Sequence, residues 1–267
     1  MGKVVLVTGG SRGIGAAIVA SLAGRGMTVF AASRSGKVET EGAFGVEMDV
    51  TSADSISAAV ARIMKEQGRL DAVVVNAGNG IAGALEETTE EEMRYQFETN
   101  FFGAIKTING CIPALRESRG RIIAITSVAA LLPLPYQGLY SSVKAALQMA
   151  VKAYAVELKP FGIQCCCVLP GDTSTGFTSA RKFTAASADK DSLYRERFDK
   201  CIAKIEKDET GGMPPSRIAS AVTRQLLRRR MKTTVIPRID YGAIGILVRI
   251  LPTRLVLWIV GLLYNSR

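Results

Sequence analysis

The sequence contains no histidine, and this absence removes several kinds of active site. A histidine-ligated metal and a Ser-His catalytic pair are both excluded. Any general acid or base must therefore be a Tyr, Lys, Asp, Glu or Cys side chain. The 267 residues are nevertheless enough for one α/β domain with a large core.

Cysteine is scarce, with five residues and no Cys-x-x-Cys pair. No secretory signal precedes the first predicted strand, so we expect a reducing compartment and a cytoplasmic location. Three cysteines are consecutive, at 165–167, on a predicted strand whose successive side chains point to opposite faces. They cannot close on one ion, so we expect core residues and no metal site.

Acidic residues are almost missing near the C-terminus. Of 34 basic and 24 acidic residues in the chain, ten basic residues and one acid, Asp240, lie in 214–267, so the remainder is nearly balanced. This asymmetry indicates an anionic partner for the segment, either a lipid surface or nucleic acid. No polybasic or zinc-finger pattern favours nucleic acid, so we expect none.

Apolar runs of strand length alternate with helix-like patterns. The predicted strands are KVVLV, MTVFAAS, AFGVEM, LDAVVVN, GRIIAITS, GIQCCCVLP and TTVIP, and the helical patterns cover 13–25, 52–67, 89–116, 141–159 and 215–230. Because the strands are continuously apolar, both faces of the sheet are expected to lie under helices. The prediction is an α/β fold with a single doubly wound parallel sheet of the Rossmann type.

One catalytic domain is expected over residues 1–240, followed by an apolar and basic extension over 241–267. No internal repeat interrupts the domain. The connection 172–212 has no clear strand and is rich in charged and small residues, which is typical of a mobile lid over a site.

A glycine-rich loop, TGGSRGIG from Thr8 to Gly15, directly follows the first strand and opens the first helix. Its glycines allow a tight turn that brings backbone N–H groups and a helix N-terminus to a pyrophosphate. A site specific for NAD has an acid about 20 residues further on, for the ribose 2′-hydroxyl. This chain has Ser33 and Arg34 there. Arg34, helped by Arg12, can pair with a 2′-phosphate, so NADP(H) is the expected cofactor.

From Lys3 to about Thr178 the sequence resembles the short-chain dehydrogenase/reductase family. The motifs that carry the resemblance are, in order, TGGSRGIG, MDVT around Asp49, NAG at 76–78, Asn100, Ser127, Tyr140 with Lys144, and PGDTST from Pro170. Each motif is short and common, but together, with Ser127 thirteen residues before Tyr140, they are highly specific. The resemblance implies an NADP-dependent enzyme that acts on CH–OH groups.

The resemblance also assigns roles to particular residues. Tyr140 is implied as proton donor, Ser127 as the partner of the substrate carbonyl, Lys144 as a ligand of the cofactor ribose, and Asn100 as part of a proton relay. Asp49 and Val50 would border the adenine, and Asn76 to Gly78 the ribose side. The expected cofactor-binding residues are Thr8, Gly9, Ser11, Arg12, Gly13, Ile14, Gly15, Arg34, Asp49, Val50, Asn76, Ala77, Gly78, Tyr140, Lys144, Pro170, Gly171, Thr173 and Thr175.

The spacing of Tyr140 and Lys144 agrees with these roles. The two residues lie four apart in a helical pattern, so they share one face. A Lys ammonium one turn away, together with an oxidised nicotinamide, favours the phenolate and lowers the pKa of the tyrosine. A cofactor-binding protein without turnover is the alternative class, but such proteins typically lose the tyrosine or the lysine, and this chain keeps both.

The connection between Ser127 and Tyr140 is unusually apolar. Val128, Leu131, Leu132, Leu134 and Tyr136 would line a pocket for a ketone or alcohol on a large lipophilic skeleton, or pack as core beneath the lid. The overall pattern is most similar to the 17β-hydroxysteroid and retinol dehydrogenase branch, which implies a steroid-like or other lipid substrate. PGDTSTGF is also similar to 3-ketosphinganine reductases, and a 3-ketosphinganine or 3-ketoacyl thioester is the alternative substrate.

The C-terminal segment 246–264 is apolar but is interrupted by Arg249, Pro252 and Arg254. Its uncharged run from Leu255 to Tyr264 is about half of the roughly 20 residues that a spanning helix needs. Two interpretations stay open: a helix packed over the pocket or a dimer partner, and a segment lying on a membrane surface. The extension differs from the glycine-rich end of tetrameric 3-ketoacyl-carrier-protein reductases, so the resemblance implies a homodimer through the long helices.

Overall fold

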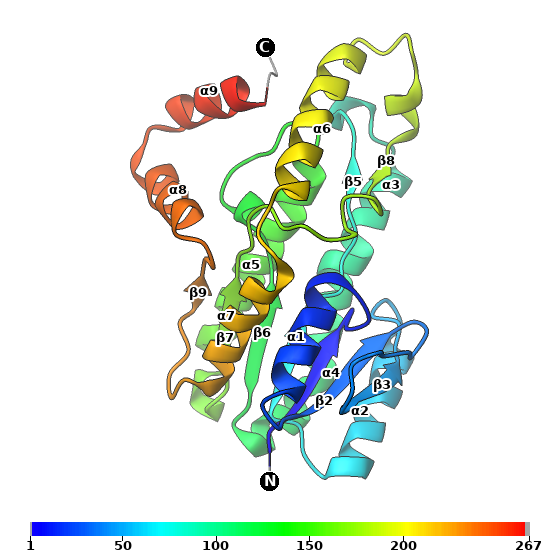
Figure 1. Cartoon of the computed structure of the whole chain (residues 1–267), viewed down its shortest axis with the longest axis vertical. Coiled ribbons are helices and arrows are strands. Elements are labelled where there is room, and N and C mark those ends of the chain that lie inside the picture. Colours follow the sequence, from blue (N-terminus) through cyan, green and yellow to red (C-terminus); the bar gives the residue numbers. More distant parts are fainter. Residues whose placement is uncertain (1, 265–267) are drawn as a thin grey trace.

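A parallel seven-stranded sheet lies at the centre of the molecule (Figure 1). The computed structural model describes residues 2–264, so residues 265–267 of the predicted extension lie outside the described residues. The strands are β1 (Val4–Thr8), β2 (Thr28–Ser33), β3 (Ala43–Glu47), β4 (Ala72–Val75), β6 (Arg121–Ile125), β7 (Gln164–Val168) and β9 (Thr234–Val235). Their order is β3-β2-β1-β4-β6-β7-β9. All seven predicted strands are present, and the predicted doubly wound fold is confirmed.

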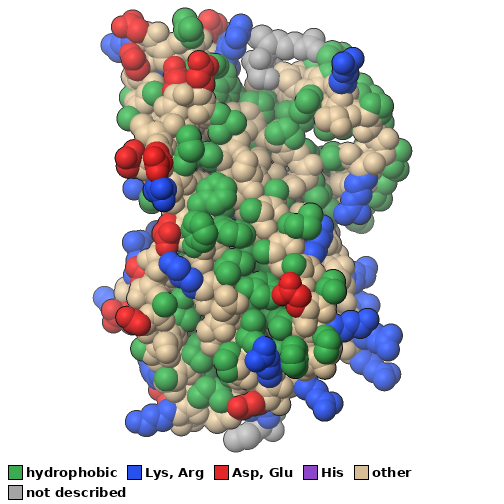
Figure 2. All heavy atoms as spheres, turned by 180° about the vertical axis from the view of Figure 1, so that it is seen from behind, with side chains coloured by type: hydrophobic (Ala, Val, Ile, Leu, Met, Phe, Trp, Pro, Cys, Tyr) green, Lys and Arg blue, Asp and Glu red, His purple; other side chains and the backbone are tan. Residues whose placement is uncertain are grey.

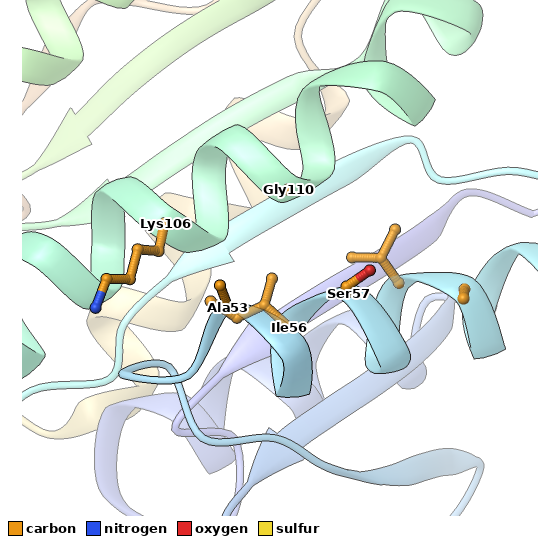
Figure 3. Close-up of a pocket in the computed structure, with 7 residues that line it drawn as sticks. Ala53, Ile56, Ser57, Lys106 and Gly110 are labelled. Carbon is orange, nitrogen blue, oxygen red and sulfur yellow. The ribbon is translucent and has the colours of Figure 1, made fainter.

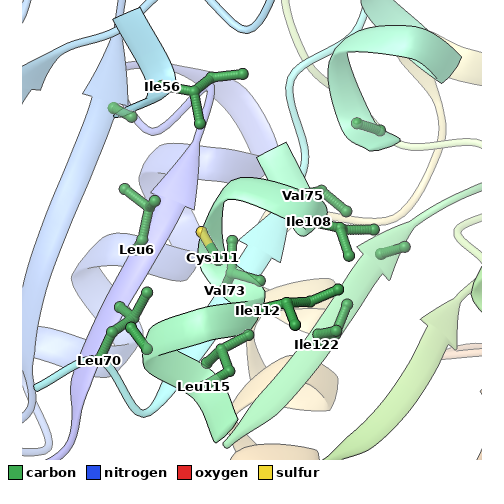
Figure 4. Close-up of a cluster of buried hydrophobic side chains, with 14 of the residues drawn as sticks. Leu6, Ile56, Leu70, Val73, Val75, Ile108, Cys111, Ile112, Leu115 and Ile122 are labelled. Carbon is green, nitrogen blue, oxygen red and sulfur yellow. The ribbon is translucent and has the colours of Figure 1, made fainter. Parts of the chain in front are cut away.

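Helices cover both faces of this sheet because each buried strand presents apolar side chains to both sides. Helices α1 (Gly13–Ala23) and α7 (Pro215–Leu227) lie on one face, and α2 (Ala53–Gln67), α4 (Ala104–Ser118) and α5 (Gly138–Glu157) on the other. In β1, Leu6 enters the core under α2 and α4 (Figure 4), whereas Val5 and Val7 enter the core under α1 and α7. A one-residue slip of the strand would exchange these sets.

The three consecutive cysteines of β7 follow the same alternation. Cys165 and Cys167 belong to one core and Cys166 to the other, and burial raises the pKa of each thiol to about 12. The predicted core role is confirmed, because side chains on opposite faces of a sheet cannot bind one ion.

The long helix predicted over 89–116 is divided into three parts. Helix α3 (Glu90–Phe97) begins at a Thr89 and Glu92 capping box, a wider π-helical turn, η2, covers Glu98–Gly103, and α4 follows. Such a turn inserts extra backbone into a helix and is frequent at functional sites. Short 3₁₀ turns complete the secondary structure: η1 (Leu85–Glu87), η3 (Val128–Ala130), η4 (Lys159–Phe161) and η5 (Ala185–Ala188).

The predicted lid, 172–212, contains regular structure that its composition did not indicate. Strand β8 (Lys182–Phe183) pairs in parallel with β5 (Ile81–Ala82), and helix α6 (Arg195–Thr210) follows. A third apolar cluster, formed by Phe198, Cys201, Ile202 and Ile205 with Ala82, holds α6 against the domain. The expectation of a connection without a strand was wrong, because β8 is only two residues long and is specified by its partner rather than by a pattern of its own.

The extension forms two helices at the edge of the sheet, α8 (Ile239–Ile250) and α9 (Thr253–Leu263), shown in orange and red in Figure 1. Only Gly245, Val256 and Val260 are buried among the described residues of the two helices. Across residues 2–264, no helix is both long and apolar enough to cross a membrane. The interpretation of a packed helix therefore accounts for a small part of this segment.

Candidate active site

The site begins at the carboxyl end of β1, where the order of the strands reverses. Gly9 and Gly13 have φ angles of +63° and +55°, which favour glycine. A Cβ on Gly15 would lie 2.0 Å from the Gly9 carbonyl oxygen, so this position needs a bare backbone. Arg12 precedes α1 and forms no side-chain cap. The first amides of α1 therefore stay available to a pyrophosphate, which binds at such helix ends in dinucleotide folds.

The end of β4 is fixed to the glycine loop by hydrogen bonds. The Thr8 hydroxyl accepts from the backbone N–H groups of Asn76 and Ala77 at 2.9 and 3.0 Å. The Asn76 amide donates to the Thr8 carbonyl at 3.0 Å. A Cβ on Gly78 would lie 2.7 Å from Asn100 Oδ1 and 3.6 Å from Lys144 Nζ. The NAG motif thus has two functions here: it holds two strand ends together, and it lets the backbone pass close to two predicted site residues.

Tyr140 and Lys144 lie on one face of α5, as their spacing predicts. Lys144 Nζ lies 5.6 Å from the centre of the Tyr140 ring and donates to the Ile125 carbonyl, at the end of β6, at 3.3 Å. Ser127 follows the same strand, and its hydroxyl donates to the Pro170 carbonyl at 3.4 Å. The structure therefore brings α5 and the ends of β6 and β7 together around the tyrosine.

Burial dominates the protonation of the pair. It raises the pKa of Tyr140 to about 12, an effect that the Ser127 hydroxyl partly offsets, although part of the ring is exposed. Burial also lowers the pKa of Lys144 to about 8. The expected lowering of the tyrosine pKa by Lys144 does not occur in the chain by itself, because desolvation of the enclosed hydroxyl outweighs a partly neutral lysine. The tyrosine is therefore a protonated phenol at neutral pH.

Asn100 lies in the π-helical turn and is 1 % exposed. Its amide nitrogen donates to the side-chain oxygen of Asn79 at 2.7 Å and to the Gln96 carbonyl at 2.9 Å. Its oxygen Oδ1 is buried and has no hydrogen-bond partner within the described chain. A buried amide oxygen left without a partner is costly, so this atom fits an acceptor role toward a bound group or a water chain.

Arg12 and Arg34 are both exposed, at the glycine loop and at the end of β2. Neither guanidinium forms a hydrogen bond or ion pair with any of residues 2–264, apart from the long-range attraction between Arg34 and Asp49. Hydrogen bonds from the Thr51 N–H and hydroxyl lower the pKa of Asp49, so it is a carboxylate at neutral pH. Val50 is 8 % exposed and packs in the core, so its backbone rather than its side chain can border a ligand.

The segment after β7 crosses over the glycine loop. The side chain of Thr175 lies 3.6 Å from the position of a Cβ on Gly13, which places the predicted residues Pro170, Gly171, Thr173 and Thr175 beside the helix N-terminus. Thr173 donates to the Gly171 carbonyl at 2.8 Å and is 9 % exposed. Two residues beyond Thr175, the Phe177 ring lies 5.7 Å from the Tyr140 ring.

Several residues near the tyrosine were not predicted from the sequence. Phe177 is one, and the buried guanidinium of Arg181, bonded to Glu209 of α6, is another. Asp172 is a third: its carboxylate accepts a hydrogen bond from the Tyr241 hydroxyl of α8. The phenylalanine directly follows PGDTST, so it could have been proposed by position, whereas the other contacts join segments far apart in the chain.

The apolar connection 128–136 lies between the core and the lid. Val128 and Leu131 pack against the main core, and Leu132 and Leu134 are half-buried. The Tyr136 ring lies 5.5 Å from that of Phe198 on α6. Much of the connection therefore packs beneath the lid, which is one of the two predicted arrangements.

A surface groove between α2 and α4 lies away from these residues (Figure 3). Ala53, Ile56 and Ser57 line it from α2, and Lys106 and Gly110 from α4. None of its lining residues was predicted as a site residue. The converging strand ends, rather than this groove, form the candidate site.

Comparisons with known proteins agree with this geometry. The family model described as short chain dehydrogenase matches residues 3–185. A curated 3-ketodihydrosphingosine reductase from Bacteroides thetaiotaomicron is 37 % identical over 228 residues, which cover 85 % of this chain and 84 % of the relative.

Solved structures show the same fold. A short-chain dehydrogenase from Streptomyces avermitilis superposes with a TM-score of 0.81 at 29 % identity, covering 92 % of this chain and 91 % of that one. An alcohol dehydrogenase from Thermococcus sibiricus, complexed with 5-hydroxy-NADP, has a TM-score of 0.71 at 26 % identity and covers 88 % of this chain and 96 % of its own. The chain therefore belongs to the short-chain dehydrogenase/reductase family, and it is an oxidoreductase that acts on CH–OH groups with a nicotinamide cofactor.

Proposed function

We propose that the protein is an NADP(H)-dependent oxidoreductase that interconverts a ketone and a secondary alcohol on a lipophilic substrate. The observation that supports this most is the convergence of Ser127, Tyr140, Lys144 and Asn100 beside a glycine loop with uncapped helix amides. The buried Asn100 oxygen and the bare backbone at Gly15 and Gly78 fit a dinucleotide. A nicotinamide cofactor, when bound, supplies hydride chemistry.

In the proposed mechanism the protein's own groups move the proton. Ser127 donates a hydrogen bond to the substrate carbonyl oxygen and holds it near the Tyr140 hydroxyl. Tyr140, protonated at neutral pH, gives its proton to that oxygen as the ketone is reduced. Lys144 binds the ribose side of the cofactor, and Asn100 connects the site to the Asn79 backbone and side chain for proton resupply.

For the substrate, we propose a ketone on a long-chain lipid of the sphingoid type rather than a steroid. The similarity to a 3-ketodihydrosphingosine reductase extends over 228 residues and thus beyond the eight-residue motif that first indicated it. The half-buried apolar residues of the connection 128–136 are suited to an alkyl chain as well as to a ring system.

A substrate panel tests this proposal. NADPH absorbance is followed with 3-ketodihydrosphingosine, a 17-ketosteroid, a retinoid aldehyde and a 3-ketoacyl thioester. We expect the highest kcat/KM with the sphingoid ketone. A higher value for the steroid would restore the steroid-like substrate, and turnover of none of the four would contradict a lipophilic ketone.

Arg34 is expected to decide the preference for NADP(H). A charged hydrogen bond to the 2′-phosphate contributes a few kcal/mol at most, so Arg34→Ala should weaken NADPH binding by about 10- to 100-fold and leave NADH nearly unchanged. Titrations of both cofactors measure this, with Arg25→Ala, an exposed arginine beyond the other end of α1, as the matched control. Equal kcat/KM of the wild-type enzyme with NADPH and NADH would refute the preference.

Cofactor binding is expected to depend on pH through Lys144. Because burial lowers its pKa to about 8, the ammonium is present below that pH and is lost as the pH rises through it. A charged donor contributes about 1 kcal/mol more than a neutral one, so the cofactor dissociation constant should rise about fivefold above pH 8. Titrations across this range in wild type and Lys144→Ala measure the effect, and an identical pH profile in both would assign it to another group.

For location and assembly, we propose a cytoplasmic homodimer that touches a membrane peripherally. The five cysteines are free and buried, as suits a reducing compartment. Met149 and Val156 leave apolar side chains exposed on α5, one of the long helices through which the dimer is expected to form. Light scattering of the purified protein measures the assembly, and a monomer at all concentrations would remove the dimer from the proposal.

A further inference from the structure

The two C-terminal helices expose an unusual amount of apolar surface. Ten large apolar side chains are exposed between Ile239 and Leu263, as many as in all other described residues together. We define the C-terminal apolar face by six of them that are about half exposed or more: Ile246, Leu247 and Ile250 on α8, and Leu257, Trp258 and Leu263 on α9. Figure 2 shows apolar side chains gathered over this upper right lobe of the molecule. Monomeric proteins in water rarely leave a surface of this kind uncovered.

The shape of the segment excludes a span and favours a surface position. Helices α8 and α9 have 12 and 11 residues, and Pro252 separates them. A helix of this length extends about 17 Å, roughly half the hydrocarbon thickness of a bilayer. Short amphipathic helices of this kind lie in the interface between headgroups and acyl chains.

Positive charge accompanies the apolar face. Arg249 and Arg254 are exposed at the junction of α8 and α9. A second basic run, 228–232, lies at the opposite end of edge strand β9, where Arg121 donates to the Arg228 carbonyl. The apolar face and the basic run therefore share one edge of the sheet, and Figure 2 shows Lys and Arg side chains on this flank below the lobe.

We infer that α8 and α9 dock on the surface of an anionic phospholipid bilayer through the C-terminal apolar face and the flanking arginines. Apolar side chains insert between the headgroups, and the arginines pair with lipid phosphates. A second copy of the chain is a poorer occupant, because a twofold interface would bring Arg249 and Arg254 of both copies together without acids between them. The inference extends the proposed peripheral location to particular residues, and its test needs no substrate.

Docked helices of this kind adjoin the catalytic loop. The Tyr241 ring of α8 lies against Gly171, where a Cβ would be 2.3 Å from the ring, and its hydroxyl bonds Asp172. At the far end of α9, Tyr264 packs against the apolar cluster of α6. The two ends of the docking segment thus contact the loop after β7 and the lid. A lipid substrate leaving the bilayer at α8 and α9 reaches the lid without crossing water.

Flotation of the full chain with vesicles tests the docking surface. Vesicles of phosphatidylcholine with phosphatidylglycerol are compared with phosphatidylcholine alone, at low and high salt. Wild type should float with the anionic vesicles at low salt. Leu247→Glu with Ile250→Glu should reduce binding at least about tenfold, and Arg249→Gln with Arg254→Gln about tenfold. The matched control is Leu193→Glu, which alters an exposed apolar residue outside the segment.

A spectroscopic signal and two other measurements separate the outcomes. Trp258 is the only tryptophan of the chain, so its emission should shift to the blue when anionic vesicles bind. Wild type that stays unbound at low salt, or charged α8 variants that float like wild type, would overturn the inference. Loss of a dimer in the α8 variants without lipid would assign the face to a second copy and also overturn it. Turnover of a short water-soluble ketone in each variant separates a failure of docking from a failure of the proposed enzymatic activity.

Discussion

Replacing Tyr140 with phenylalanine is expected to reduce turnover by at least about a hundredfold while cofactor binding stays close to wild type. The substitution removes the hydroxyl that gives its proton to the substrate oxygen and keeps the ring that packs against Phe177. Steady-state kinetics with NADPH and a cofactor titration followed by nicotinamide fluorescence measure the two effects separately.

The matched control for this substitution is Tyr154→Phe on the same helix. The Tyr154 hydroxyl donates to Asn109 at 2.6 Å, away from the strand ends of the site, so its loss should leave turnover nearly unchanged. Activity of Tyr140→Phe above a tenth of wild type would show that another group delivers the proton.

Lys144→Ala should damage cofactor binding and turnover together. The lysine is proposed to hold the ribose, and its position 5.6 Å from the Tyr140 ring centre lets its charge act on the phenol. Loss of a charged hydrogen bond of about 1.5 to 3 kcal/mol weakens binding about 10- to 100-fold. Cofactor titration and kcat/KM of the same preparation measure both effects.

Lys144→Met separates charge from packing, because Lys144 is buried and the alanine leaves a space. The methionine variant should lose cofactor affinity as the alanine variant does, with a smaller loss of thermal stability. Lys152→Ala, two turns further along α5, is the control for the helix itself. Unchanged cofactor affinity in both Lys144 variants would remove the lysine from the ribose site.

The sequence was sufficient for the central sheet and its helices, because their patterns are local. Continuous apolar runs specify buried parallel strands, and TGGSRGIG specifies the turn into α1. The division of the predicted helix 89–116 escaped notice because a π-helical turn has no sequence signature of its own. Strands β5 and β8 depend on pairing between residues about a hundred positions apart, which no local pattern encodes.

The candidate site shows the same division between local and distant information. Tyr140 and Lys144 share a helix, so their contact follows from spacing alone. The pKa of Tyr140 could not be predicted from that spacing, because it depends on how completely the lid and the loop after β7 enclose the hydroxyl. The bond between Tyr241 and Asp172 joins two segments whose proximity only the folded chain establishes.

Transfer of deuterium from the cofactor to a lipid ketone tests the central claim most directly. The enzyme is incubated with 3-ketodihydrosphingosine and NADPH carrying deuterium at the reactive face of the nicotinamide C4, and the product is analysed by mass spectrometry. We expect an alcohol that carries a single deuterium at the former carbonyl carbon with wild type and with Tyr154→Phe, and almost no product with Tyr140→Phe. A product without deuterium, or no alcohol from the wild-type enzyme, would contradict the proposed reduction.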